Sequence, residues 1–219
     1  MTPDFDRAAI AAAETLIKYN ITSAPVSALP ILKRIPGVLV FSYQDMSSEV
    51  EQDRSCVISM FGEKNQDAFT TVNIHNGEPQ YIITYNQQLP LFIVQRSLAR
   101  ELGHIVLGHD GSLPEDVRHQ EAKAFANHFL SPRALIHSIE ALGLRVTKEV
   151  LGNLTGCYDY CLGCMRKLPA THVPAELNRQ VRDQFMPYIL NFFEYQRTAS
   201  LKDGSALADF GTYMEGYEE

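Results

Sequence analysis

The stretch SLARELGHIVLGHD, residues 97–110, decides how this chain is interpreted. Its apolar residues recur at the three- and four-residue spacing of an amphipathic helix, and the pattern reaches back to Pro90. Glu101 and His104 are three residues apart, so on a helix their side chains share one face. Gly108 predicts the C-terminal end, because glycine is the preferred residue just beyond a helix. We therefore expect a helix that presents a carboxylate and an imidazole side by side.

Glu101 and His104 occupy the second and fifth places of the zinc motif H-E-x-x-H. In that motif the two histidines bind one zinc ion, and the glutamate polarises a metal-bound water as general base. The first place is held here by Arg100. Arginine stays protonated and offers only hydrogen-bond donors, so it cannot bind a cation. The motif therefore keeps a candidate base and one candidate ligand, and lacks the other ligand.

A second segment, EAKAFANHFLSP at residues 121–132, extends the match. Together the two segments resemble the ImmA/IrrE family of metallopeptidases, in which a HELGH helix is followed by E-A-N-x-F-A and a Leu-x-Pro stop. Lys123 stands where that pattern has asparagine. The resemblance extends over about residues 5–170, and its specific part is confined to 95–132. The matching residues of the second segment are Glu121, Ala122, Phe125, Ala126, Leu130 and Pro132.

The resemblance implies an α+β fold: a zincin-like domain with a small, mostly antiparallel sheet, an active-site helix and a C-terminal helical subdomain. It implies Glu101 as the catalytic base, and His104 and Glu121 as zinc ligands. It also implies a protein or peptide substrate, namely a transcriptional regulator of the repressor type.

Arg100 leaves three hypotheses open. In the first, the site holds no metal, and Arg100 forms a pocket salt bridge with Glu121, or with Glu101, through charge-assisted hydrogen bonds. In the second, zinc binds through a substitute ligand. In the third, the segment is an ordinary core helix. Zinc is therefore a candidate cofactor only, and the sequence leaves open whether the chain is an active peptidase or an inactive pseudoprotease that binds a regulator.

His109 is the first candidate for a substitute ligand. It follows His104 by five residues, which is a rotation of about 140° on an ideal helix. The two side chains can meet only if the chain leaves the helix near Gly108. His119 and His128 are the further options for this role, whereas His75, His137 and His172 stand in no functional pattern.

Strands and helices are expected in two blocks. Four runs rich in β-branched and aromatic residues come first, and HNGEP at 75–79 predicts a hairpin turn between the last two. The expected strands are 38–43, 56–61, 68–74 and 80–86; the expected helices are 4–19, 90–107, 114–130, 133–142, 147–154, 157–167 and 174–196. The expected domains are a zincin-like domain at 1–132, a helical subdomain at 133–197 and an acidic, flexible tail at 198–219.

A DNA-binding function is the least favoured alternative. Residues 147–168, TKEVLGNLTGCYDYCLGCMRKL, are compatible with two short helices joined by a turn, as in a helix-turn-helix motif. Tyr158, Asp159 and Tyr160 stand where a DNA reader would carry Arg, Asn or Gln. The formal net charge of −7 also disfavours a phosphate-binding surface. No nucleic-acid partner is expected.

The expected location is the cytoplasm, without a membrane partner. The longest apolar run, LPLFIV, is far shorter than the roughly 20 residues that a membrane helix needs. The N-terminal segment lacks the positive cluster of a signal peptide. The cysteines are then expected to be buried thiols rather than disulfides or metal ligands. They are Cys56, Cys157, Cys161 and Cys164.

Overall fold

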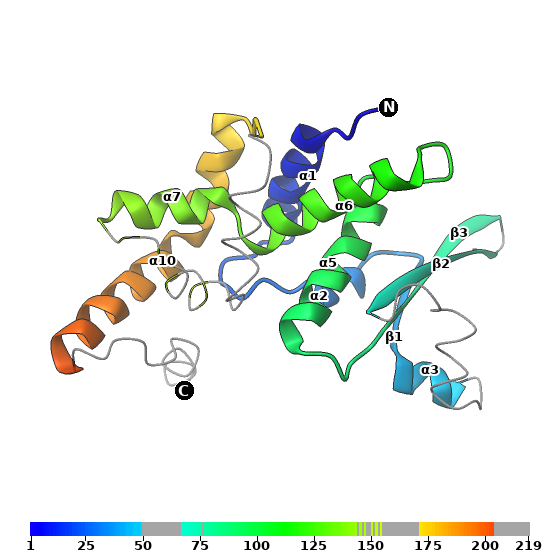
Figure 1. Ribbon diagram of the computed structural model, residues 1–219, viewed down its shortest axis with the longest axis horizontal. Coiled ribbons are helices and arrows are strands. Elements are labelled where there is room, and N and C mark those ends of the chain that lie inside the picture. Colours follow the sequence, from blue (N-terminus) through cyan, green and yellow to red (C-terminus); the bar gives the residue numbers. More distant parts are fainter. Residues whose placement is uncertain are drawn as a thin grey trace. The chain divides into compact units, whose positions relative to one another are not determined.

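The computed structural model describes most of the chain as two units, which are treated separately below (Figure 1). The first unit contains residues 1–3 and 27–126, and the second contains residues 4–26 and the described residues after 126. The fold is α+β, as the sequence predicts, with a zincin-like arrangement of helices and a small sheet. The described residues are 1–49, 67–75, 77–143 and 171–203, with the single residues 145, 147, 150, 152 and 154.

The first unit contains a three-stranded mixed sheet in the order β1-β3-β2. Strands β2 (Ala68–His75) and β3 (Glu78–Tyr85) are antiparallel, and His75 pairs with Glu78 across the hairpin. The predicted turn is therefore confirmed, and Gly77 has the positive φ of 83° that such a tight turn requires. Strand β1 (Val38–Ser42) pairs with β3 in parallel. The strand expected at 56–61 lies outside the described residues.

Helix α5 (Leu91–Val106) packs against β2 and β3, and also against the short helix α2 (Leu29–Leu32). A second short helix, α3 (Tyr43–Glu49), follows β1. The apolar face of α5 is buried, with Leu98 and Leu102 almost inaccessible to solvent, so the predicted period is confirmed. Glu101 is also buried on this helix, where the other buried side chains are uncharged, and a buried carboxylate is uncommon.

Helix α6 (Glu115–Leu130) begins after Pro114, as predicted, and its residues up to Ala126 belong to the first unit. It approaches α5 closely at Gly103. A methyl group on Gly103 would lie 2.9 Å from Cδ1 of Phe125 and 3.2 Å from the backbone oxygen of Ala122. Phe125 is fully buried, so its ring has little room to move away.

The second unit is helical. Helix α10 (Ala175–Asp203) packs against α1 (Phe5–Lys18) and α7 (Arg133–Ala141). The Gln184 side-chain amide donates to the backbone oxygens of Leu16 and Ile21, which fixes α10 to the end of α1. The core of this unit includes the buried side chains of Leu16, Phe129, Leu135, Ile139, Phe185, Tyr188, Ile189, Phe192 and Tyr195.

Several predicted features fall partly or wholly outside the described residues. They include all four cysteines, the helix at 157–167, half of the residues of the helix at 147–154, and residues 204–219 of the expected tail. Helix α10 continues to Asp203, seven residues beyond its predicted end, because neither glycine nor proline occurs between Gln196 and Gly204. Among the described residues, no helix has both the length and the apolar character needed to cross a bilayer.

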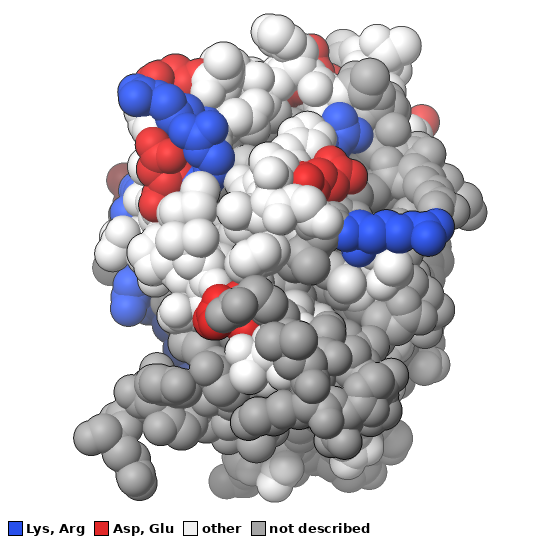
Figure 2. Space-filling view, turned by 90° about the vertical axis from the view of Figure 1, so that its left-hand side faces the viewer, with Lys and Arg blue, Asp and Glu red and all other residues white. Residues whose placement is uncertain are grey.

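The described charges are mixed in sign. Arg179 pairs with Glu176 and Arg182 pairs with Asp183 along α10. Figure 2 shows basic and acidic side chains close together on one face, without a continuous basic area among the described residues of that face.

Gly103→Ala is expected to lower the free energy of unfolding by about 1 kcal/mol. Overpacking against Phe125 costs about 1–3 kcal/mol, which exceeds the gain of about 1 kcal/mol in helix propensity. Urea denaturation followed by circular dichroism measures the change. Gly111→Ala is the control, since nothing lies within 4 Å of a methyl group there. A Gly103→Ala protein more stable than the wild type would contradict the close packing of α5 on α6.

Candidate functional site

A polar pocket opens where the sheet of the first unit meets α5. Its volume is about 230 Å³, which exceeds the space required by several water molecules. Strands β2 and β3 supply apolar and hydroxyl groups, while α5 and the residues after it supply the charged groups and the imidazoles. Its lining residues are Phe69, Thr70, Val72 and Tyr81 from the sheet, Arg100, Glu101, His104 and Ile105 from α5, and His109, Arg118 and His119 from beyond it.

Both oxygens of the Glu101 carboxylate are engaged. The Thr70 hydroxyl donates to Oε2 at 2.7 Å, and the Arg100 guanidinium lies 3.5 Å from Oε1. Burial raises the pKa of Glu101 above its usual range, while the hydrogen bond from Thr70 and the charge of Arg100 oppose the shift. The carboxylate predicted as a catalytic base is thus already held by two neighbours.

The end of α5 brings His109 back to His104. Gly108 has a positive φ of 61°, and its amide donates to the Ile105 carbonyl. The His109 amide donates to the His104 carbonyl at 3.0 Å. This pair of bonds is the Schellman arrangement, which reverses the chain direction at a helix end. The chain therefore leaves the helix at Gly108. This departure is what allows the His109 side chain to reach His104, as the sequence predicted.

His109 connects His104 to Glu121. Its Nδ1 lies 2.9 Å from Nδ1 of His104, and its Nε2 lies 3.0 Å from Oε2 of Glu121. The His109 and Glu121 side chains are only 1% and 4% exposed, so these contacts are made away from water. One proton on each ring is sufficient for both contacts, with His104 donating to His109 and His109 donating to the Glu121 carboxylate. Two contacts thus connect the three side chains.

The surroundings of His104 are electropositive. Burial is the main cause that lowers the pKa of His104 to about 3, and the neighbours His109, His119, Arg100 and Arg118 lower it further. His104 is therefore neutral at physiological pH. The guanidinium groups of Arg100 and Arg118 also make the pocket less favourable for a divalent cation.

The donors in this arrangement do not fit a zinc ion. His109 directs its two ring nitrogens at two different neighbours, so it cannot join both His104 and Glu121 around one ion. Among the described residues, no three His, Cys, Asp or Glu side chains are placed to share a metal ion. Arg100, at the first place of the motif, adds a fixed positive charge instead of a ligand. The metal-binding roles of His104, Glu121 and His109 stay predictions.

The remaining sequence candidates occupy different places. His119 packs its ring edge-on against His104, with 5.6 Å between the centroids. His128 belongs to the second unit, where its Nε2 lies 3.3 Å from the Thr171 hydroxyl. Of the two carboxylates considered for Arg100, Glu101 is the one that lies within ion-pair distance.

Sequence analysis missed Thr70 and Arg118. Thr70 is 31 residues from its partner Glu101, on a strand whose alternation gave no sign of that contact. Arg118 stands at no motif position; its Nε donates to the Leu113 carbonyl at 3.2 Å, which holds it at the start of α6. Only the pairing of elements in space brings these side chains to the pocket.

Comparison with known proteins shows that part of the chain matches a family model. Residues 55–154 match the model of the Peptidase_M78 family, described as the IrrE N-terminal-like domain. The match contains the whole of the segment 95–132, on which the resemblance depends, and begins before the hairpin of β2 and β3. No curated protein and no solved structure gave a significant match to the chain.

Acidification should destabilise the metal-free protein through His104. Its pKa is lowered to about 3 in the folded state from 6.5, so the unfolded chain takes up the proton first as the pH falls. The stabilisation is therefore complete above pH 6.5 and is lost towards pH 3. One such group accounts for about 2 kcal/mol between about pH 7.5 and about pH 5. Urea denaturation in the presence of a chelator measures the free energy of unfolding at each pH. We expect it to fall less with decreasing pH in His104→Gln than in the wild type. An equal fall in the two proteins would contradict the expected titration of His104.

Proposed function

Since residues 55–154 belong to the IrrE N-terminal-like family of metallopeptidase-type domains, we propose that the chain is a pseudoprotease of that family. It binds a segment of a regulatory protein in the pocket of the first unit and does not cleave it by metal-dependent hydrolysis. The observation that carries the proposal is the ion pair between Arg100 and the buried Glu101.

The ion pair supports a binding role because it gives the buried carboxylate a cation. A buried carboxylate needs a positive partner or a proton, and a metal ion would supply such a charge in an active peptidase. Arg100 supplies that charge with an amino-acid side chain. A zinc ion next to the guanidinium would meet Coulomb repulsion in a poorly solvated pocket.

The composition of the pocket supports an extended peptide as its ligand. Among the described strands, β2 lies at one end of the order β1-β3-β2, so its outer edge can pair with a further extended segment. Phe69, Val72 and Ile105 offer apolar contacts next to that edge. A ligand of this kind gains main-chain hydrogen bonds from the strand and side-chain contacts from the pocket.

The charge of the pocket favours an acidic or carbonyl group on the bound segment. The buried Nε of Arg100 has no hydrogen-bond partner among the described residues. Unsatisfied buried donors cost free energy, and an acceptor on a ligand would remove that cost. Arg118 adds a second guanidinium to the pocket lining. That the partner is a transcriptional regulator rests on the family resemblance alone.

A zinc peptidase with a substitute ligand is the second candidate, and one observation favours it. His104, His109 and Glu121 are side chains of the types that bind zinc, and contacts of 2.9 Å and 3.0 Å connect them. Zinc binding by this set would require His109 to give up one of the two contacts. In that case Glu101 would also have to release Arg100 to act on a water molecule.

Peptides selected from a random display library against the purified chain test the proposal. We expect Val72→Lys to weaken their binding at least about tenfold, since a charged side chain would disturb the apolar wall beside β2. Leu190→Lys, which places the same charge on an exposed position of α10 in the second unit, should leave affinity unchanged. Fluorescence anisotropy measures both.

The same peptides separate binding from hydrolysis. Incubated with the protein and zinc, they should stay intact in mass spectra, and Glu101→Gln should still bind them. Cleavage that Glu101→Gln abolishes would overturn the pseudoprotease proposal and favour the zinc peptidase. Equal binding by wild type and Val72→Lys would place the peptide site elsewhere.

A further inference from the structure

We propose that the pocket of the first unit binds the C-terminal residue of its partner peptide, with an apolar side chain against the sheet and the terminal carboxylate at Arg100 and Arg118. The inference rests on the proposed peptide-binding function and names the part of the peptide that the pocket recognises. The pocket combines an apolar wall and two guanidinium groups within about 230 Å³. A small part of the ligand therefore has to match both properties.

The apolar side of the pocket suits one hydrocarbon side chain. Phe69 and Val72 of β2 and Ile105 of α5 line it. Val72 is 55% exposed, so a ligand that covers it removes apolar surface from water, which favours binding. An aliphatic or aromatic side chain of the peptide would gain this contribution.

Arg100 keeps hydrogen-bonding capacity after it pairs with Glu101. A guanidinium offers five donors, and the ion pair involves Nη2, which lies 3.5 Å from Oε1 of Glu101. The buried Nε of Arg100 has no hydrogen-bond partner among the described residues. The side chain is 26% exposed, so a ligand in the pocket can reach the guanidinium.

Arg118 brings a second guanidinium to the lining. Its Nε donates to the Leu113 carbonyl at 3.2 Å, and the described part of the chain gives its Nη groups no hydrogen bond or ion pair. Hydrogen bonds from Ser112 are the main cause that lowers the pKa of the exposed Asp110, and the charge of Arg118 contributes least. Asp110 is not among the described lining residues, so Arg118 can pair with a carboxylate of the ligand.

The charge of the lining favours an anion over a cation. Among the lining residues that the structure describes, two guanidiniums face one carboxylate, that of Glu101. The Thr70 hydroxyl and the Arg100 guanidinium already engage both of its oxygens. A carboxylate that enters beside Arg100 and Arg118 forms charge-assisted hydrogen bonds in a partly buried site, where such bonds are strong.

The size of the pocket selects the end of a peptide chain. An apolar cavity of about 150 Å³ accepts benzene, so 230 Å³ holds about one large amino-acid residue. In an extended peptide, neighbouring side chains point to opposite sides, and the next one on the same side is about 7 Å away. An internal acidic residue and an apolar neighbour therefore cannot share this pocket. The last residue of a chain carries its side chain and a carboxylate on one Cα, so it supplies both groups.

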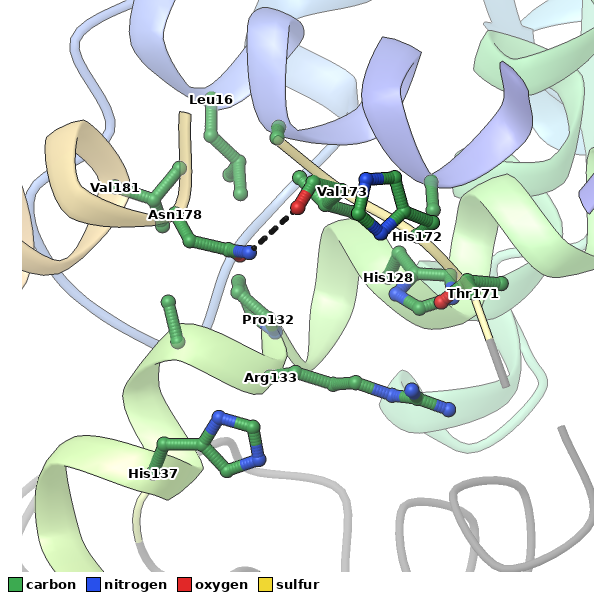
Figure 3. Close-up of a pocket in the computed structure, with 13 residues that line it drawn as sticks. Leu16, His128, Pro132, Arg133, His137, Thr171, His172, Val173, Asn178 and Val181 are labelled. Atoms are coloured by element: carbon green, nitrogen blue, oxygen red, sulfur yellow. Dashed lines mark hydrogen bonds between the residues drawn. The ribbon is translucent and has the colours of Figure 1, made fainter. Parts of the chain in front are cut away.

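The second unit contains a further pocket, which supplies a control variant (Figure 3). This pocket has a volume of about 140 Å³, and all of its described lining residues belong to the second unit. Arg133 lines it together with His128, whose Nε2 lies 3.3 Å from the Thr171 hydroxyl. Arg133→Met therefore removes a guanidinium that lines a pocket while every residue of the first unit stays unchanged.

Peptides with free carboxyl termini, selected from a display library against the full chain, test the inference. Each peptide is synthesised with a label at its N-terminus, both as the acid and as the C-terminal amide, and fluorescence anisotropy gives the two Kd values. We expect amidation to weaken binding at least about tenfold, because the amide loses the charge that faces the guanidiniums. Selected peptides should end in an apolar residue.

The ratio of the two Kd values separates recognition of the carboxylate from a loss of stability. Arg118→Met should reduce the preference for the acid at least about threefold, whereas Arg133→Met should leave it at the wild-type value. A variant that only destabilises the fold would weaken the acid and the amide equally. Equal effects of the two variants on the ratio would overturn the role of Arg118.

Equal affinities of acid and amide, or binding that depends on an internal Asp or Glu, would overturn recognition of the C-terminus. If Val72→Lys still weakens binding in that case, the proposed peptide site in the pocket stands. If Val72→Lys has no effect, or if the library gives no binder, the proposed function fails as well.

Discussion

The Arg100 guanidinium lies 3.5 Å from the buried Glu101 carboxylate, and the chemistry of the first unit depends on that pair. A buried carboxylate is tolerated only with a positive charge, a proton or several hydrogen bonds, and Glu101 has the guanidinium and the Thr70 hydroxyl. Because its oxygens are engaged, Glu101 is poorly placed to activate water. His104 and Glu121 are engaged in turn through His109. Both carboxylates are thus held by side chains of the protein itself.

Two histidines that line pockets, His104 and His128, show how the two units differ. Burial together with neighbouring positive charge lowers the pKa of His104 in the first unit and of His128 in the second. Near His104, Arg100 pairs with Glu101 and His109 contacts Glu121, while the Nε of Arg100 has no hydrogen-bond partner among the described residues. Near His128, the Thr171 hydroxyl lies 3.3 Å from Nε2. The two histidines therefore share the direction of their pKa shift and differ in the polar groups around them.

Sequence periodicity predicted the elements that local interactions determine. The bounds of α5 and α6, the hairpin at Gly77 and the family resemblance all followed from apolar spacing, caps and turn residues. Contacts between distant segments could not be read in this way. The bond from Thr70 to Glu101 depends on how β2 lies on α5, and the parallel pairing of β1 depends on the crossover that follows it. The pocket of the second unit joins α1, the end of α6, α7, the segment 171–173 and α10, and its histidines His137 and His172 stand in no sequence pattern.

The contact between His109 and His104 could be predicted only in part from the sequence. Its distance from His104 along the chain argued against contact on a continuous helix, and Gly108 identified the place where the helix could end. Whether the chain then returned towards His104 depended on the pair of Schellman hydrogen bonds, which only the folded backbone reveals. The domain boundaries and the roles of Glu101, His104, Glu121, His109 and Arg100 stay predictions for experiment.

Zinc content tests the replacement of the metal by Arg100 most directly. Purified, untagged protein is dialysed first against zinc and then against zinc-free buffer, and bound zinc is counted by elemental mass spectrometry. We expect almost none in the wild type and about one ion per chain in Arg100→His, which restores the missing ligand. Arg96→His, one helical turn earlier on α5, is the matched control and should bind none. Near-stoichiometric zinc in the wild type, lost in His104→Ala, would contradict a metal-free site.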